Sequence, residues 1–94
     1  MNFYVYIIQS EFDKSFYKGF TEHPLKRLTE HNNKDSKYTS TKTPWRLIYV
    51  EGFNTKREAL IREKALKKFS NEQIRRLIIS PKNVIDKFIV NSDD

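Results

Sequence analysis

A chain of 94 residues is long enough for one domain with a modest core and too short for two. The absence of cysteine excludes disulfide bonds and thiolate metal sites, and it fits a protein of the reducing cytoplasm. Because 18 Lys+Arg stand against 12 Asp+Glu, the formal net charge of +6 favours a polyanionic partner, and nucleic acid is the common case.

No apolar run in the sequence has the length of a signal-peptide core or of a membrane-spanning helix. We therefore expect a soluble, cytoplasmic protein without a membrane partner. No long stretch combines a basic face with a bulky apolar one, so the sequence does not indicate binding to an acidic membrane surface either.

Residues 3–8 and 15–20 are rich in aromatic and β-branched side chains, which favours two strands. The polar segment between them supplies turn-forming Ser and Asp, so the strands are predicted to form an antiparallel hairpin. Period-two alternation places Tyr6 on one face and its neighbours Val5 and Ile7 on the other. At least one tyrosine-bearing face therefore need not belong to the core, although ordinary sheet tyrosines would give the same pattern.

A helix is predicted over residues 24–31, with a proline in its first turn, where the missing N–H costs nothing. Leu25 and Leu28 recur at helical spacing and are expected to face the sheet. Arg27 and His31 are four residues apart, so they share a neighbouring face of this helix.

Residues 32–43 are almost entirely polar and predict a mobile loop that could grip phosphates. The side chains suited to such contacts are Lys34, Ser36, Lys37, Thr39, Ser40, Thr41 and Lys42. An ordinary solvated loop explains the same composition equally well, because phosphate contacts have no sequence signature.

Residues 45–50 predict a third strand, and Asn54 or Thr55 can cap a following helix over about residues 56–69. The buried side chains of that helix should be Ala59, Leu66 and Phe69.

Glu63 has a helical position that is unusual for a carboxylate. It lies four residues after Ala59 and three before Leu66, so it should point toward the sheet, facing the tyrosine hairpin. Buried carboxylates are uncommon without a partner. The alternative is a structural glutamate that leans aside and pairs with Lys67 or Arg62.

Ser70 and Gln73 form a capping-box pattern that predicts a further helix to about residue 79, and an amphipathic segment is expected over residues 83–90. We thus expect a single domain over residues 1–94 with a core at about 3–69 and a helical extension at about 70–90. The predicted fold class is α+β, a small three-stranded antiparallel sheet flanked by helices.

Six positions of distinct chemistry follow one another along the chain: Tyr6, Tyr17, Gly19, Arg27, His31 and Glu63. In order and spacing this set resembles the GIY-YIG nuclease domain, with Tyr4-Val5-Tyr6 as the first part of the family name and Tyr17-Lys18-Gly19 as the second. The resemblance covers about residues 4–68. It is strongest to the small stand-alone bacterial members, which are similar to the catalytic domain of excision-repair endonuclease subunits.

The resemblance implies a metal-dependent endonuclease that acts on nucleic acid, DNA rather than RNA, in repair or processing. It assigns a divalent cation, Mg²⁺ or Mn²⁺, to Glu63 and the scissile phosphate to Arg27. It makes Tyr6 the usual base, with Tyr17 close by and His31 orienting or deprotonating a phenol. A free phenol has a pKa of about 10, so we expect nearby positive charge to lower the pKa of the basic tyrosine.

Five lysines are candidate nucleic-acid contacts: Lys18, Lys34, Lys37, Lys42 and Lys67. Two rival functions remain open, a domain that binds nucleic acid without cutting it and a protein-interaction module whose amphipathic C-terminal segment docks on a partner. The choice between DNA and RNA, the preferred substrate structure and the oligomeric state also stay open.

Overall fold

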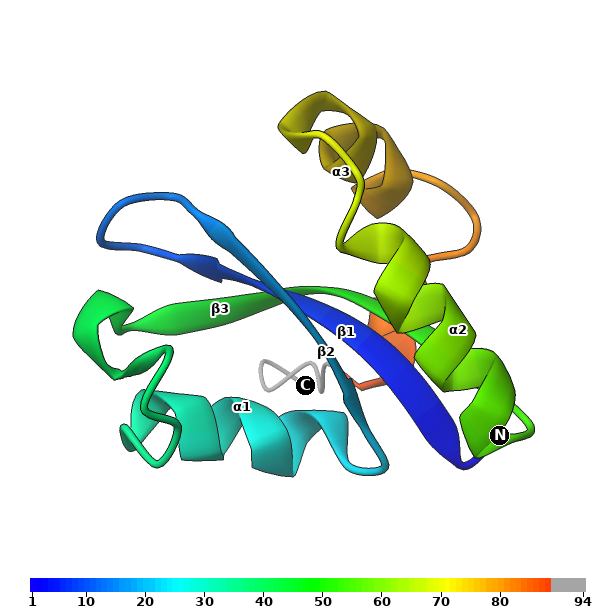
Figure 1. Ribbon diagram of the computed structural model, residues 1–94, viewed down its shortest axis with the longest axis horizontal. Coiled ribbons are helices and arrows are strands. Elements are labelled where there is room, and N and C mark those ends of the chain that lie inside the picture. Colours follow the sequence, from blue (N-terminus) through cyan, green and yellow to red (C-terminus); the bar gives the residue numbers. More distant parts are fainter. Residues whose placement is uncertain (89–94) are drawn as a thin grey trace, which may run out of the picture.

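The computed structural model describes residues 1–88 as a three-stranded antiparallel sheet with helices on both faces (Figure 1). The elements in chain order are β1 (Phe3–Ser10), β2 (Phe16–Thr21), α1 (Pro24–Asn32), the 3₁₀ turn η1 (Ser40–Lys42), β3 (Trp45–Phe53), α2 (Lys56–Leu66), α3 (Asn71–Ile78) and the 3₁₀ turn η2 (Ile85–Lys87). The predicted α+β class and three-stranded sheet are confirmed.

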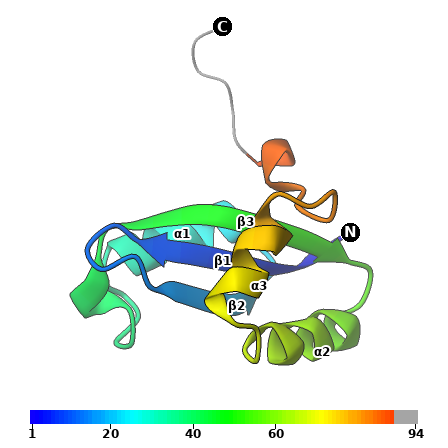
Figure 2. The same ribbon diagram turned by 90° about the horizontal axis from the view of Figure 1, so that it is seen from above.

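Strand β1 is the centre of the sheet, which has the order β2-β1-β3. The register pairs Tyr6 with Gly19 on β2 and with Val50 on β3, and the pairing with β3 shifts between Ile7 and Ile8. Helix α1 lies on one face, whereas α2 and α3 lie on the other (Figure 2). The short β2 is a free edge of the sheet.

The alternation of side chains in β1 creates two core clusters, one on each face. Val5 and Ile7 pack with residues of α2 and α3, whereas Tyr6 and Ile8 pack on the α1 side. Because helices cover both faces, the Tyr6 side chain is buried. The expectation of an open, tyrosine-bearing face is therefore wrong for this residue.

Helix α1 buries a stripe that begins one residue earlier than predicted. Pro24 and His31 are buried and Leu28 packs on the Tyr6 cluster, at positions i, i+4 and i+7, so these three face the sheet. Leu25 is 45% exposed, and the prediction that it faces the sheet is wrong. Because the buried stripe of α1 is shifted by one residue, the His31 side chain faces the sheet and is buried there.

The caps of the later helices follow the sequence signals. The Thr55 hydroxyl accepts a hydrogen bond from the Glu58 N–H at the start of α2, and the predicted capping box of Ser70 and Gln73 is present at the start of α3. Helix α2 ends at Leu66, three residues before the predicted end. Ala59 and Leu66 are buried, and Phe69 packs against the same cluster.

The segment after α3 does not form the predicted helix over residues 83–90. Within the described part it makes only η2, and residues 89–90 lie outside it. Asn83 ties this segment to the sheet, because its carboxamide accepts from the Val50 N–H at 3.1 Å and donates to the Ile48 carbonyl at 3.0 Å. Hydrogen bonds between the Asn83 side chain and β3 thus hold this segment in place, where helical hydrogen bonds were expected. Over residues 1–88 no helix has both the length and the apolar character needed to cross a membrane.

The pairing of Tyr6 with Gly19 gives a first prediction. A Cβ added at Gly19 would lie 2.5 Å from the Tyr6 ring and phenol oxygen, so Gly19→Ala must displace a buried aromatic side chain. We expect a loss of about 1–3 kcal/mol in the free energy of unfolding, measured by chemical denaturation. The control is Gly52→Ala, where the closest atom is the flexible Met1 thioether at 2.8 Å. An equal loss in both variants would contradict the special role of Gly19.

Candidate active site

Tyr6 crosses from the central strand toward the sheet edge. Its ring lies against Gly19 of β2 at a distance that leaves no room for a side chain there. Glycine at this position is therefore a steric requirement for the placement of the phenol.

The Tyr6 hydroxyl meets His31 of α1 inside the protein. The phenol oxygen is 2.8 Å from His31 Nε2, and the opposite ring nitrogen, Nδ1, is 2.7 Å from the Thr39 hydroxyl. All three side chains are buried. A continuous hydrogen-bonded chain therefore connects β1, α1 and the loop before β3.

Thr39, which the sequence suggested as a phosphate contact in a mobile loop, is instead a buried partner of His31. Its carbonyl accepts a hydrogen bond from the Trp45 indole at 2.9 Å, and its hydroxyl is 3.5 Å from the Ser36 carbonyl. The loop of residues 33–43 is thus anchored at a buried point, and Thr39 is not free to contact phosphate. A single hydroxyl in a polar loop has no periodic neighbours, so no pattern in the sequence distinguished it.

Two more predicted site residues lie around this chain. The Tyr17 ring packs edge-on against His31 at 5.2 Å between centroids, and it lies 6.4 Å from the Tyr6 ring. Arg27 is half-buried on α1 and forms a 2.9 Å ion pair with Glu30. Tyr6, Tyr17, Arg27 and His31 therefore gather on the α1 face of the sheet.

Burial dominates the electrostatics of the Tyr6–His31 pair. It raises the pKa of Tyr6 to about 12, and Arg27 opposes the rise while the charges of Tyr17 and Glu63 add to it. Burial, followed by the charge of Arg27, lowers the pKa of His31 to about 4. Arg27 lowers the pKa of Tyr6, as expected of a nearby positive charge, but in the protein alone the desolvation of the buried phenol outweighs this effect. Both shifts favour the uncharged pair.

Glu63 lies on a helix, α2, that packs on the opposite face of the sheet from Tyr6, whereas the predicted site required both residues on one side. The expectation that the carboxylate faces the tyrosine from the same side is therefore wrong. The side chain is 19% exposed, and its only ion pair within residues 1–88 is a loose contact of 3.6 Å with Lys67. The alternative partner, Arg62, binds Glu51 instead, at 3.0 Å.

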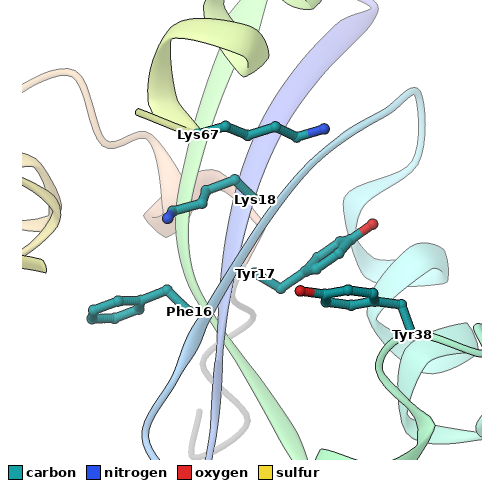
Figure 3. A pocket seen from close by; sticks show the side chains of 5 residues that line it. All are labelled: Phe16, Tyr17, Lys18, Tyr38 and Lys67. Atoms are coloured by element: carbon teal, nitrogen blue, oxygen red, sulfur yellow. The ribbon is translucent and has the colours of Figure 1, made fainter. Parts of the chain in front are cut away.

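The five candidate lysines divide into two groups. Lys18 and Lys67 line one cavity of about 450 Å³ at the β2 edge, together with Phe16, Tyr17 and Tyr38 (Figure 3). Lys42 pairs with Asp13 at 3.2 Å, and Lys34 and Lys37 are exposed on the loop before η1. Of the five, only Lys18 and Lys67 lie in the cavity that Tyr17 also lines, and Tyr17 in turn contacts His31.

Within residues 1–88 no three Asp, Glu, His or Cys side chains are grouped as they are in all-protein metal sites. A lone carboxylate still suits Mg²⁺, which keeps several water ligands and uses one or two carboxylates together with substrate phosphates. Glu63 is the candidate ligand because it is half-buried and only loosely paired.

Comparison with known proteins gives concordant matches. The chain matches the family model for the GIY-YIG catalytic domain over residues 2–76. A UPF0213 protein of Staphylococcus saprophyticus is 42% identical over 76 residues, which are 80% of this chain and 92% of that protein. A UPF0213 protein of Clostridium perfringens is 44% identical over 78 residues, 82% of this chain and 83% of that protein.

A solved structure agrees with these matches. The solution NMR structure of a UPF0213 protein from Bacillus halodurans is similar, with a TM-score of 0.56 and 31% sequence identity over 98% of each chain. The family model includes both strands of the hairpin, α1, β3 and α2, so it spans every predicted site residue. The chain therefore belongs to the GIY-YIG family of nucleases.

Proposed function

We propose that the protein is a metal-dependent endonuclease that hydrolyses phosphodiester bonds in nucleic acid, with DNA as the substrate, in repair or processing. The observation that carries the proposal is the buried chain of Tyr6, His31 and Thr39 beside Arg27. General acid–base catalysis needs such groups within hydrogen-bond reach of one another, and the phenol, the imidazole and the Thr39 hydroxyl meet this condition.

Glu63 would hold the divalent cation, Mg²⁺ or Mn²⁺. When bound, the cation would stabilise the negative charge that develops on the phosphoryl oxygens. The loose partner of Glu63, Lys67, is 58% exposed at its side chain and can leave the carboxylate without breaking a buried contact.

Tyr6 and His31 would move the proton of the attacking water. The phenol oxygen accepts that proton while its own O–H proton passes to His31 Nε2, 2.8 Å away. With a pKa of about 4, His31 is neutral near pH 7 and can accept it. Because Tyr6 has a pKa of about 12, the phenol holds its proton until substrate arrives.

The tautomer of His31 decides whether this path works. For the phenol proton to pass to His31, the Tyr6 hydroxyl must donate to Nε2. Nε2 must then be the acceptor, and the proton must lie on Nδ1, which donates to Thr39. The Thr39 hydroxyl in turn points its own proton at the Ser36 carbonyl, a long contact of 3.5 Å.

Arg27 would contact the scissile phosphate. Its planar guanidinium offers paired donors to phosphate oxygens, and its ion pair with Glu30 holds it half-buried next to Tyr6. Tyr17 would add a hydroxyl donor at the same phosphate, since its ring lies between the buried chain and the edge cavity.

The alternative function, docking of the C-terminal segment on a partner protein, would need apolar side chains that are instead packed inside this domain. Val84, Ile85 and Phe88 of the C-terminal segment pack on the Tyr6 cluster of the same chain, and Phe88 meets Tyr4 edge-on at 5.1 Å. These apolar side chains are used within the domain.

Glu63→Gln tests the cation ligand. The amide keeps shape but lacks the charge that a divalent cation requires, so cleavage should fall by orders of magnitude. Metal-free affinity for nucleic acid should stay the same or rise slightly, and the melting temperature should be unchanged or higher. Glu72→Gln is the control, because Glu72 forms an exposed i,i+4 pair with Arg76. A lower melting temperature with an unchanged cleavage rate would make Glu63 structural and end its assignment.

Thr39→Val tests the positioning role of Thr39. The variant replaces the hydroxyl by a methyl group of similar shape, so Nδ1 of His31 loses its partner and the tautomer preference. We expect a cleavage rate reduced by about 10²-fold and a shift of the His31 imidazole ¹⁵N resonances, measured by NMR. Thr39→Ser should restore both. Wild-type ¹⁵N resonances showing a protonated Nε2 would refute the proposed path.

The pH dependence of stability tests the state of His31. The unfolded chain binds a proton to this residue below its ordinary pKa of 6.5, whereas the folded protein does so only below about 4. The unfolded state therefore holds more protons between these values, and the free energy of unfolding should decrease as the pH falls from 6.5 to 4, by up to about 1.4 kcal/mol per pH unit. His31→Gln should flatten this slope, and His23→Gln, at an exposed turn, should leave it unchanged. Identical slopes for wild type and His31→Gln would contradict a neutral, buried His31.

A further inference from the structure

The cavity at the β2 edge has walls of two kinds. Tyr17 and Tyr38 lie on one side of β2 with their side chains pointing in opposite directions, whereas Phe16 and Lys18 project to the other side (Figure 3). Lys67 extends from the end of α2 toward β2. At about 450 Å³ the cavity falls in the range of small-ligand sites, roughly 300–1,000 Å³.

Tyr38 is the most exposed aromatic wall of this cavity. It is 75% exposed, although its ring packs at 5.5 Å from the half-buried Tyr17 ring. The exposed Tyr38 ring beside Tyr17 thus offers a ligand an accessible aromatic surface. A flat, polarisable ring is the complement of such a surface, because nucleobases stack on tyrosine.

Lys18 provides an unbalanced positive charge. It is half-buried on β2, and within residues 1–88 it has no carboxylate within ion-pair distance. Burial lowers the pKa of its ammonium group, a cost that an anion in the cavity would offset. Lys67 adds a second ammonium group, held only by its loose contact with Glu63.

The cavity is continuous with the proposed catalytic residues. Tyr17 forms its wall and also touches His31, and Lys67 lines it while pairing with Glu63. Tyr38 directly precedes Thr39, which holds the other side of His31. A nucleotide bound here would therefore be the neighbour of the phosphate at Arg27.

We propose that this cavity is a subsite for one unstacked nucleobase, which lies on Tyr38 and Tyr17 while Lys18 and Lys67 hold the adjoining phosphate. The inference rests on the proposed function and specifies its substrate class as nucleic acid with an unpaired nucleotide beside the bond that is cut. A base inside a duplex already stacks on its neighbours and cannot enter without being extruded.

The test is metal-free binding in EDTA, measured by fluorescence anisotropy of labelled oligonucleotides. The ligands are a single-stranded DNA, the RNA of the same sequence, the corresponding DNA duplex and a single-stranded DNA of abasic residues. We expect wild type to bind the single strand more tightly than the duplex and the abasic strand. Because DNA and RNA carry the same stacking faces and phosphates, comparing the two single strands shows which nucleic acid binds in the cavity more tightly.

Tyr38→Ala should weaken binding of the single strand by about 5- to 100-fold and leave the abasic strand and the duplex little changed. Tyr38→Phe should retain binding, because it keeps the stacking face. Phe12→Ala is the matched control, since Phe12 is a 74% exposed aromatic at the hairpin tip outside the cavity. Lys18→Ala and Lys67→Ala should each reduce the salt dependence of binding by about one phosphate contact.

Unchanged single-strand affinity in Tyr38→Ala, or an equal loss on abasic strands, would overturn the subsite. This failure is distinct from failure of the proposed function. A wild-type protein that shows the expected binding pattern but cuts none of these ligands with Mg²⁺ or Mn²⁺ would refute the nuclease and retain the subsite. Cleavage of the single strand at the wild-type rate by Tyr38→Ala, with wild-type affinity, would refute the subsite and retain the nuclease.

Discussion

The close approach of Tyr6 to Gly19 is the constraint on which the rest of the site depends. It allows a tyrosine of the central strand to extend toward the sheet edge while its hydroxyl stays buried against His31. The position of His31 in turn fixes how α1 lies on the sheet and where Thr39 must sit. Trp45 secures Thr39 through its indole, so the start of β3 belongs to the same packed unit. The absence of a Cβ at Gly19 thus makes room for contacts that join four parts of the chain.

Burial gives this unit its chemical character. Desolvation raises the pKa of the phenol and lowers that of the imidazole, so the two groups share one proton without a net charge. A charged pair would cost more in the same surroundings. The resting protein is therefore stable with its reactive groups neutral, and only charge brought by a cation and a phosphate would make proton transfer favourable.

The edge strand β2 is where the two faces of the sheet meet. Helix α1 contributes Arg27 and His31 from one side, and α2 contributes Glu63 and Lys67 from the other. A central strand would separate these groups by a continuous layer of backbone, whereas β2 is an edge strand and pairs with β1 on one side only. The aromatic and basic cavity lies at the same edge, and it is there that we propose a nucleotide binds.

The sequence by itself determined the three strands, the capped starts of the later helices and the family resemblance, because their signals are local. Alternation marks the strands within six or eight residues, caps at Thr55 and Ser70 mark the helix starts, and the spacing from Tyr6 to Glu63 carries the family resemblance. Tertiary structure decided what depends on contacts between distant segments. These include the burial of Tyr6 under α1, the anchoring role of Thr39, the placement of Glu63 on the opposite face and the hydrogen bonds of Asn83 to β3 where a last helix was expected. Desolvation and steric fit arise only when the segments pack together, so no local pattern encodes them.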